Sequence, residues 1–151
     1  MKEGIEINFL RKNDLEGLKK LYEQGFESSS FNNENVHRTY EIIKDNTSYN
    51  ILCAKIDGIV VGSVMGVACY ELFGECKPFM VIENVVVLKE FRKQGIAKRL
   101  MVQLEKRAVE LNCSMIIFVS SAHRIGAHKL YESLGFGVDK VNGYRKRLHY
   151  E

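Results

Sequence analysis

The sequence predicts an α/β or α+β domain in which helices cover a central sheet. Three observations support this fold class. Short runs rich in β-forming residues alternate with amphipathic helical stretches. The dipeptide Asp57-Gly58, a strong hairpin signal, joins two of those runs. With 151 residues, of which 46% are hydrophobic, the chain has the size of one domain, so we expect residues 1–151 to form a single domain.

The first elements follow from local patterns. Residues 5–10 alternate as a strand does, and Asp14 stands where the N-cap of a helix is expected. That helix has an apolar face made of Leu15, Leu18, Leu21 and Tyr22. After the polar segment SSSFNNEN, a second helix is predicted from the spacing of Val36, Tyr40 and Ile43.

The remaining elements alternate between strands and helices. The hairpin joins 50–56 to 59–70, and the apolar run MVIENVVVL, residues 80–88, is expected to be a buried strand. Helical periodicity covers 95–111, and a shorter helix is expected at 127–134. Further strands are predicted at 115–119, 138–141 and 144–149.

Composition and charge exclude several classes of protein. The net charge of +3 is too small to predict nucleic-acid binding, although it suits a small polyanionic ligand. Apolar stretches stop short of the roughly 18 residues of a membrane span, and acids interrupt the N-terminus where a signal peptide needs an apolar run. The four cysteines form no CxxC pair, so we expect free thiols, no metal site and a cytoplasmic protein.

The segment VVVLKEFRKQGIAKRL, residues 85–100, joins a strand end, a basic turn and a helix that starts near Gly95. Such a junction directs several backbone N–H groups and the positive end of the helix dipole at one spot. Gly95 allows close approach of a ligand, Ala97 adds little bulk, and Arg92, Lys93 and Lys98 supply positive charge. The turn therefore either binds a phosphate or pyrophosphate or is an ordinary basic turn. Neither GxxxxGK[ST] nor GxGxxG occurs, which excludes a P-loop and a Rossmann fingerprint.

Two side chains outside this turn are candidates for chemistry. Glu83 interrupts an apolar strand, so it faces water, pairs with a nearby Arg, or points into a cleft where it can act as a general base. Tyr131 lies on the apolar stripe of the run HRIGAHKLYESLGF, residues 123–136. Its ring is either simply part of the core, or its hydroxyl also donates a proton. Gly135 is expected to end that helix.

Three segments together resemble the GNAT N-acetyltransferase superfamily, whose members use acetyl-CoA. RKQGIA, residues 92–97, resembles the family's R/Q-x-x-G-x-G/A pyrophosphate loop. IENVVV, residues 82–87, is similar to the central strand, where many members carry an acid. AHKLYESLGF, residues 127–136, resembles the C-terminal signature A-x-x-x-Y-E-x-x-G-F. The resemblance extends loosely over nearly the whole chain and implies one GNAT-like domain with a mixed, mostly antiparallel sheet flanked by helices.

The resemblance implies a set of residues that bind acetyl-CoA. Loop amides are expected to hold the pyrophosphate, and the edge of the central strand to pair with the pantetheine arm, with one strand N–H polarising the thioester carbonyl. The expected cofactor-binding residues are Val85, Val86, Val87, Arg92, Lys93, Gln94, Gly95, Ile96, Ala97, Lys98, Arg124 and Ala127. Arg124 replaces an Asn that contacts pantetheine in many members, so it either reaches a phosphate or lies on the surface. Lys89 replaces a common Pro, which affects the stiffness of the loop.

The activity implied by the resemblance is that of an acyltransferase that moves an acetyl group directly to a primary amine of a small molecule or peptide. Tyr131 matches the tyrosine that protonates the departing thiolate. Glu83 matches the acid proposed to deprotonate the amine, usually across a water. A role for Glu83 in binding the substrate cation is equally compatible with this position.

Two other classes of function are alternatives. A non-catalytic CoA-binding sensor or interaction module needs neither Glu83 nor Tyr131, so the presence of both disfavours it. A nucleic-acid-binding protein would use the aromatic and basic tail from Tyr144 to Tyr150, but an edge strand protected by charges explains that tail better. We therefore expect neither a nucleic-acid nor a membrane partner.

In this family, the acceptor site is shaped by the region of the first two helices, here residues 25–36, and the loop at 70–78 is expected to form another wall. Four acids in these segments, Glu27, Glu34, Glu71 and Glu75, would attract a cationic amine. They favour a small amine, an aminoglycoside-like amine or a peptide amine over an acidic sugar phosphate. The C-terminal strands, with Tyr144 and Tyr150, allow a homodimer of the kind that family members often form.

Overall fold

The computed structural model describes residues 4–26 and 31–149. The chain divides into two compact units, Met1–Phe118 and Val119–Glu151. In its described part, the first unit contains the sheet and three α-helices, and the second contains one α-helix and a long irregular segment.

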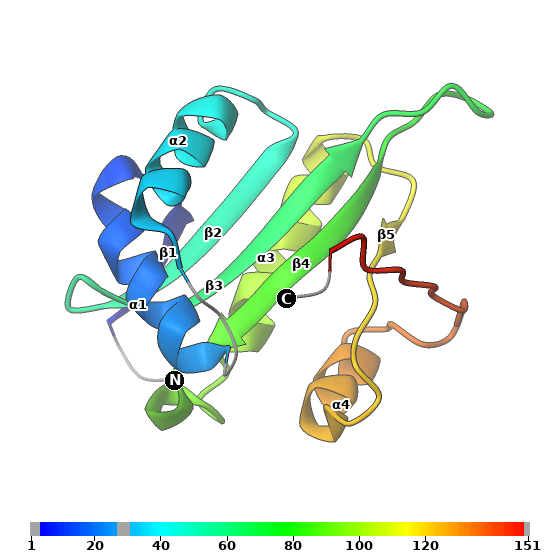
Figure 1. The fold of residues 1–151 in the computed structure, drawn as a ribbon. Helices are drawn as coiled ribbons and strands as arrows, with labels where there is room; N and C mark the ends of the chain where they lie inside the picture. Colours follow the sequence, from blue (N-terminus) through cyan, green and yellow to red (C-terminus); the bar gives the residue numbers. More distant parts are fainter. Residues whose placement is uncertain (1–3, 27–30, 150–151) are drawn as a thin grey trace. The chain divides into compact units, whose positions relative to one another are not determined.

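A five-stranded sheet runs through the first unit, with its strands in chain order (Figure 1). The first four strands pair antiparallel, and the last strand runs parallel to its neighbour. The predicted mixed, mostly antiparallel sheet is therefore confirmed. The strands are β1 (Ile5–Phe9), β2 (Tyr49–Ile56), β3 (Ile59–Cys69), β4 (Phe79–Val87) and β5 (Ile116–Ile117).

Strands β2 and β3 form the hairpin expected from the sequence. Its turn residues Asp57 and Gly58 have φ angles of 49° and 78°. Two consecutive residues with positive φ are typical of a type I′ turn, whose twist matches that of the paired strands. Ile56 and Ile59 consequently stand directly opposite each other.

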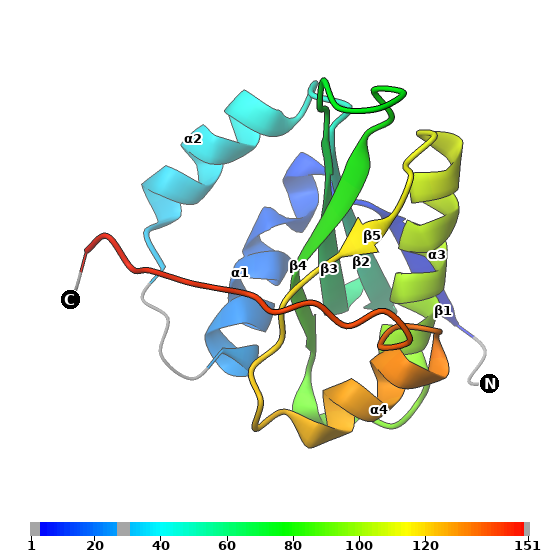
Figure 2. The same cartoon turned by 90° about the vertical axis from the view of Figure 1, so that its right-hand side faces the viewer.

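Helices cover both faces of the sheet. Figure 2 shows α1 (Leu15–Gly25) and α2 (Asn33–Ile43) on one side and α3 (Ile96–Glu110) on the other. Short 3-10 turns η1 (Lys12–Asp14) and η2 (Lys89–Phe91) precede α1 and α3. The largest fully buried apolar side chains are Leu21, Val61, Val64, Met80, Ile96, Leu100 and Leu104. No helix within the described ranges has the length and apolarity needed to cross a membrane.

The C-terminal half of α1 is attached to the sheet by a close contact and by a buried polar group. A Cβ on Gly25 would overlap Cγ2 of Val86, so the helix backbone lies directly against β4. Burial raises the pKa of Tyr22 to about 12, although a side-chain hydrogen bond with Ser63 opposes part of the rise. Ser63 is itself buried, and its Oγ donates to the Leu52 carbonyl at 2.8 Å.

Asp14 occupies the N-cap position of α1, as predicted, but its side chain does not cap the helix. Its φ and ψ of −86° and −12° are already helical because η1 leads directly into α1, whereas a capping residue needs extended backbone. The carboxylate instead accepts a bond from the Arg11 N–H at 2.9 Å and pairs with Lys55 of β2.

The second unit departs most from the sequence-based expectation. Its helix α4 (Ile125–Ser133) forms, and Gly135, with a φ of 91°, follows the end of that helix as predicted. The strands predicted at 138–141 and 144–149 are wrong, because residues 138–149 form no strand and Val138, Val141, Tyr144 and Leu148 are exposed. Residues with high β-propensity need a paired strand to form a sheet, and the described part of this unit offers none. Tyr150 lies outside the described residues.

Candidate active site

Strand β4 is paired on one edge along its length and on the other edge only at its start. On the β5 side the pairing joins Met80 to Ile116 and Val81 to Ile117, so β5 is shorter than the strand predicted at 115–119. No pairing on this edge continues past Val81 within the described residues. The C-terminal half of β4 therefore presents an open hydrogen-bonding edge.

A bulge lies in the middle of β4. Glu83 stands opposite Met65 and Val86 opposite Ser63, so Asn84 and Val85 together face a single residue of β3. Asn84 has a φ of 56°, a left-handed conformation. A bulge of this kind bends the strand and redirects its side chains. The apolar pattern of the strand did not predict this bulge, although Asn is one of the non-glycine residues that adopt this conformation most readily.

Glu83 is exposed beside this bulge. No hydrogen bond or ion pair engages its carboxylate among the residues that the structure describes, so pairing with a nearby Arg is not observed. A carboxylate at this position remains accessible to an incoming ligand. On the same strand, Val86 and Val87 are buried and Val85 is half-buried.

The turn before α3 has unpaired backbone donors. Among the described residues, no acceptor engages the N–H groups of Lys93 to Lys98, and the first bond of α3 runs from the Arg99 N–H to the Gly95 carbonyl at 3.0 Å. Lys93 and Gly95 have φ angles of 60° and 79°, and such alternation turns successive N–H groups into an anion-binding concavity. A Cβ on Gly95 would meet nothing within 4 Å, so this side of the loop is open.

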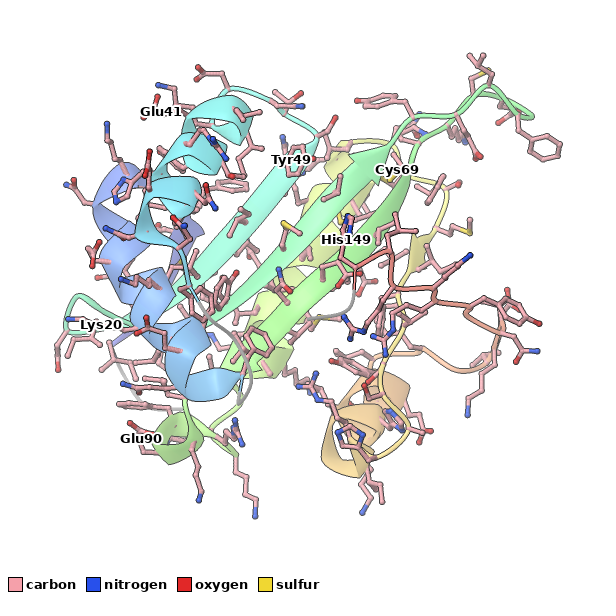
Figure 3. The ribbon with its side chains drawn as sticks, viewed as in Figure 1. Lys20, Glu41, Tyr49, Cys69, Glu90 and His149 are labelled. Carbon is pink, nitrogen blue, oxygen red and sulfur yellow. The ribbon has the colours of Figure 1, made fainter. Side chains whose placement is uncertain are left out.

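The side chains of this turn shape it as well. Nε of Arg92 donates to the Val87 carbonyl at 3.0 Å, which ties the loop back to the end of β4. Nε2 of Gln94 donates to the Glu90 carbonyl at 3.3 Å, while its Oε1 is buried without a partner in the described structure. Figure 3 shows Glu90 just past one end of β4, whereas Tyr49 and Cys69 lie near the opposite end of the sheet.

The remaining residues of the turn differ in how far their side chains are exposed. Ile96 is buried and anchors the start of α3, and Ala97 is half-buried. Lys93 and Lys98 are exposed and leave positive charge beside the free N–H groups. The helix dipole adds to this field, so the turn is electrostatically favourable for an anion.

The other candidate residues lie in the second unit. Tyr131, on α4, is buried, and this burial raises the pKa of its hydroxyl while Arg124 lowers it in part. Arg124 is exposed at the N-cap position of α4, and Ala127 is half-buried. Tyr131 therefore keeps its proton at neutral pH, as a proton donor must.

The acids expected near an acceptor are only partly described. Glu27 lies outside the described residues, as do residues 28–30 of the same loop. Glu34 is exposed, Glu71 is half-buried, and Glu75 pairs with Lys77 at 3.5 Å. Of these acids, only Glu75 has an ion-pair partner within the described ranges.

Sequence comparison decides the family. The model of the Acetyltransferase (GNAT) family matches residues 15–136, most of the chain. The chain belongs to the GNAT acetyltransferases. Aminoglycoside N(6')-acetyltransferase type 1 of Salmonella typhimurium is 27% identical over 97 residues, which cover 62% of this chain and 67% of that protein.

Two solved structures share the fold. Glucosamine-6-phosphate N-acetyltransferase from Arabidopsis thaliana matches with a TM-score of 0.86 and 21% identity, covering 97% of this GNAT chain and 100% of that chain. Aminoglycoside N-acetyltransferase AAC(6')-Iy in complex with CoA matches with a TM-score of 0.79 and 23% identity, covering 97% of each. These findings confirm the predicted family, the mixed α/β fold and the enzyme class, an acetyl-CoA-dependent N-acetyltransferase. The neighbours are named for different acceptors, so the fold does not select one.

Proposed function

We propose that this GNAT protein transfers the acetyl group of acetyl-CoA directly to a primary amine of a small molecule or peptide, and that residues 1–151 act as one acetyltransferase domain. The observation that carries the proposal is the run of unpaired N–H groups from Lys93 to Lys98 at the start of α3. A pyrophosphate provides the acceptors that these donors lack. No feature of the described residues favours a non-catalytic module.

The open edge of β4 and the basic turn form the proposed coenzyme site. Val85, Val86 and Val87 offer backbone groups to the pantetheine arm, while Arg92 holds the turn through its bond to the Val87 carbonyl. Gln94, Gly95, Ile96 and Ala97 contribute N–H groups, and Lys93 and Lys98 add charge. Arg124 and Ala127 are proposed as contacts from α4, with Arg124 directed to a phosphate.

Acetyl-CoA supplies the acetyl group as an activated thioester. In the proposed transfer the amine nitrogen bonds to the carbonyl carbon while the C–S bond breaks. Glu83 accepts the proton that the amine loses, directly or through a water, and the Tyr131 hydroxyl gives its proton to the departing sulfur. A raised pKa suits Tyr131 to this role because the hydroxyl then stays protonated at neutral pH.

We propose a cationic amine as the acceptor. Glu34 and Glu71 have no ion-pair partner among the described residues, so their charge is available to an ammonium group. The Salmonella relative is named for aminoglycosides, which are polycationic amines. In a panel of an aminoglycoside, a polyamine, a peptide amine and glucosamine 6-phosphate, the cationic amines should give the higher kcat/KM. A clear preference for glucosamine 6-phosphate would contradict this assignment.

The role of Glu83 is tested by a pH series. In Glu83→Gln, kcat/KM should fall most at low pH and recover partly as pH rises, because the amine then deprotonates without a base. The matched control is Glu105→Gln, which removes an exposed carboxylate from α3. A higher KM for the amine with unchanged kcat would instead assign Glu83 to binding the substrate cation.

The role of Tyr131 distinguishes a catalyst from a binding module. Tyr131→Phe should lower kcat by about 100-fold, the lower range for general acid catalysis, with little change in CoA affinity. Tyr144→Phe, which alters an exposed tyrosine of the same unit, is the control. Tight CoA binding by the wild type without turnover on any amine would support the non-catalytic alternative.

We also propose that the enzyme is a cytoplasmic homodimer. Its four cysteines are all free thiols, as a reducing compartment favours. Size-exclusion chromatography with light scattering should give the mass of two chains. A monomer at micromolar concentration would contradict the dimer.

A further inference from the structure

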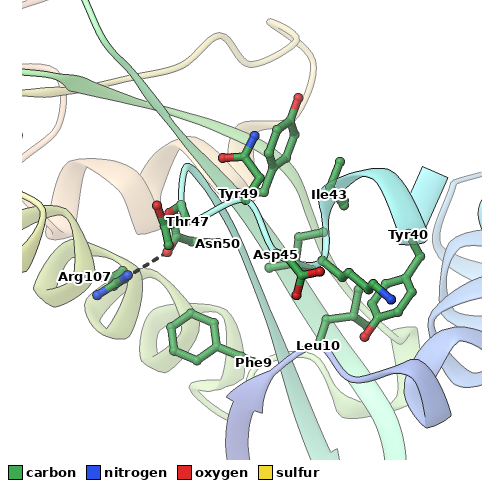
Figure 4. Close-up of a pocket in the computed structure, with 12 residues that line it drawn as sticks. Phe9, Leu10, Tyr40, Ile43, Asp45, Thr47, Tyr49, Asn50 and Arg107 are labelled. Carbon is green, nitrogen blue, oxygen red and sulfur yellow. Dashed lines mark hydrogen bonds between the residues drawn. The ribbon is translucent and has the colours of Figure 1, made fainter.

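An open pocket of about 340 Å³ lies in the first unit (Figure 4). Its wall is formed by the C-terminal ends of β1 and α2, the start of β2 and one side chain of α3. The volume is within the range of about 300–1,000 Å³ that small-molecule sites occupy. The residues that matter for its chemistry are Phe9, Tyr40, Asp45, Tyr49, Asn50 and Arg107.

This pocket is separate from the candidate coenzyme site. Strands β2 and β4 are both antiparallel to β3, so they run in the same direction with β3 between them. Tyr49 at the start of β2 therefore lies at the opposite end of the sheet from Glu90, which follows β4 (Figure 3). No residue proposed for acetyl transfer lines the pocket.

Arg107 is a fixed cation in the pocket wall. Its Nε donates to Oδ1 of Asn50 at 2.9 Å, and its guanidinium lies 5.8 Å from the centre of the Phe9 ring. Asn50 is only 2% exposed, and its own amide group donates to the Thr47 and Ser48 carbonyls, so this support is rigid.

Much of the guanidinium remains available to a ligand. One further N–H bonds the exposed Glu110 at 3.1 Å, a surface pair that is worth little. The other three of its five donors have no partner within the described residues. A planar fork of free donors matches the two oxygens of a carboxylate.

The opposite charge comes from Asp45. No ion pair engages Asp45 in the described structure, whereas its neighbour Lys44 pairs with Glu41. In the view of Figure 4, Asp45 and Arg107 lie on either side of the Phe9 ring. The pocket wall thus carries an acid without an ion-pair partner in the described structure, a guanidinium with free donors, and an aromatic ring.

Apolar and aromatic side chains make up most of the remaining wall. Phe9 and Tyr49 are 51% and 38% exposed, so part of each ring is accessible to a ligand. Tyr40, Ile43 and Leu10 extend this surface. A ligand that fits has an apolar or aromatic body and carries both a carboxylate and an ammonium group.

We propose that this pocket is a second ligand site that binds a free α-amino acid with an apolar or aromatic side chain, its carboxylate on Arg107 and its ammonium on Asp45. The side chain of the amino acid packs against Phe9, Tyr40 and Tyr49. This site goes beyond the proposed acetyl transfer and stands whether or not that proposal does.

Proton–nitrogen NMR titration of the full chain, saturated with CoA, tests the proposal with L-phenylalanine as the probe. Shifts should saturate at the amides of residues 45–50 and at Nε of Arg107. 3-Phenylpropionate, which lacks the ammonium, and phenethylamine, which lacks the carboxylate, should each bind about tenfold more weakly or worse, the loss expected for one charged hydrogen-bonded contact. Equal binding of all three probes, no saturable shift, or shifts confined to residues 82–88 of the acetyl-transfer site would each overturn the proposal.

A single variant tests the role of Asp45 in ligand binding without disturbing a buried position. Asp45→Asn alters an exposed side chain and should weaken L-phenylalanine about tenfold while leaving 3-phenylpropionate unchanged. Lys106→Gln, an exposed neighbour of Arg107 outside the pocket, is the matched control and should change neither probe. Equal losses for both probes in Asp45→Asn would reject the assigned role of Asp45 and with it the proposal.

Discussion

Gly25, the last residue of α1, lies so close to Val86 of β4 that any side chain at position 25 would overlap the Val86 methyl group. Val86 is itself buried, so it has little room to move away. The end of α1 is thus packed on the half of β4 that carries the bulge and the open edge.

We expect Gly25→Ala to lower the free energy of unfolding by about 1–3 kcal/mol, the usual cost of overpacking a core contact. Urea denaturation measures the change. In the Val86→Ala background, Gly25→Ala should lower the free energy of unfolding by less than it does in the wild type, because the overlapping methyl group is gone.

The matched control for this pair is Gly126→Ala in α4, where a Cβ would meet nothing within 4 Å. It should be neutral or stabilise by up to about 1 kcal/mol, because alanine favours a helix. Strictly additive effects of Gly25→Ala and Val86→Ala would contradict the contact.

Gly95 gives a prediction about coenzyme binding. Its φ of 79° is left-handed, so Gly95→Ala should cost about 1–2 kcal/mol if the backbone keeps its shape. We expect this strain to turn the N–H groups of the turn away and to raise the Kd for CoA, as measured by calorimetry. Gly95→Asn should be milder because asparagine tolerates this conformation. Wild-type affinity in Gly95→Ala would show that the turn is not the phosphate site.

Stability should fall in alkaline solution. Burial raises the pKa of Cys53 from 9.0 to about 11 and that of Tyr22 from 10.0 to about 12. Between the ordinary and the raised value, the unfolded chain loses a proton that the folded chain keeps. The free energy of unfolding therefore decreases as pH rises, from about pH 9 for Cys53 and about pH 10 for Tyr22, by on the order of 2 kcal/mol each.

Tyr22→Phe isolates the second of these contributions. Denaturation at a series of pH values should show a smaller decrease above pH 10 in this variant than in the wild type. Tyr144→Phe, at an exposed position, should leave the wild-type profile unchanged. Identical slopes for Tyr22→Phe and the wild type would argue against burial as the cause.

Three of the four thiols should react in an order set by their exposure. Cys76 is exposed and should be alkylated first by iodoacetamide, whereas Cys53 is fully buried with a raised pKa and should react only after unfolding. Burial also raises the pKa of Cys113, which should react more slowly than Cys76. Peptide mapping by mass spectrometry gives the rates. Native-state modification of Cys53 as fast as that of Cys76 would contradict the packing around β2.

Sequence predicts best where the determinants are local. Asp57 and Gly58 specify a turn by themselves, and the period of α3 places Leu100, Leu104 and Ala108 on one buried face. Residues 138–149 show the opposite case. Their β-forming side chains suit a strand, but a strand depends on a distant partner that local composition does not reveal.

The candidate site divides in the same way. The turn at Lys93 to Lys98 is a strand-to-helix junction, so its free N–H groups follow from chain order. The bulge at Asn84 depends on the register between β3 and β4, which shifts by one residue at this point. The pattern of apolar residues does not determine that shift. The bond between Asn50 and Arg107 joins residues 57 positions apart, and only the folded sheet brings them together.

The half-paired strand β4 also has a consequence for solubility. An open strand edge is a template on which another chain can assemble, and long flat edges promote aggregation. In β4 the left-handed Asn84 interrupts the edge, and the exposed charge of Glu83 stands directly before it. The regular run that remains, Val86 and Val87, is too short for a stable intermolecular sheet, so the bulge in the candidate site also disfavours assembly of further strands on this edge.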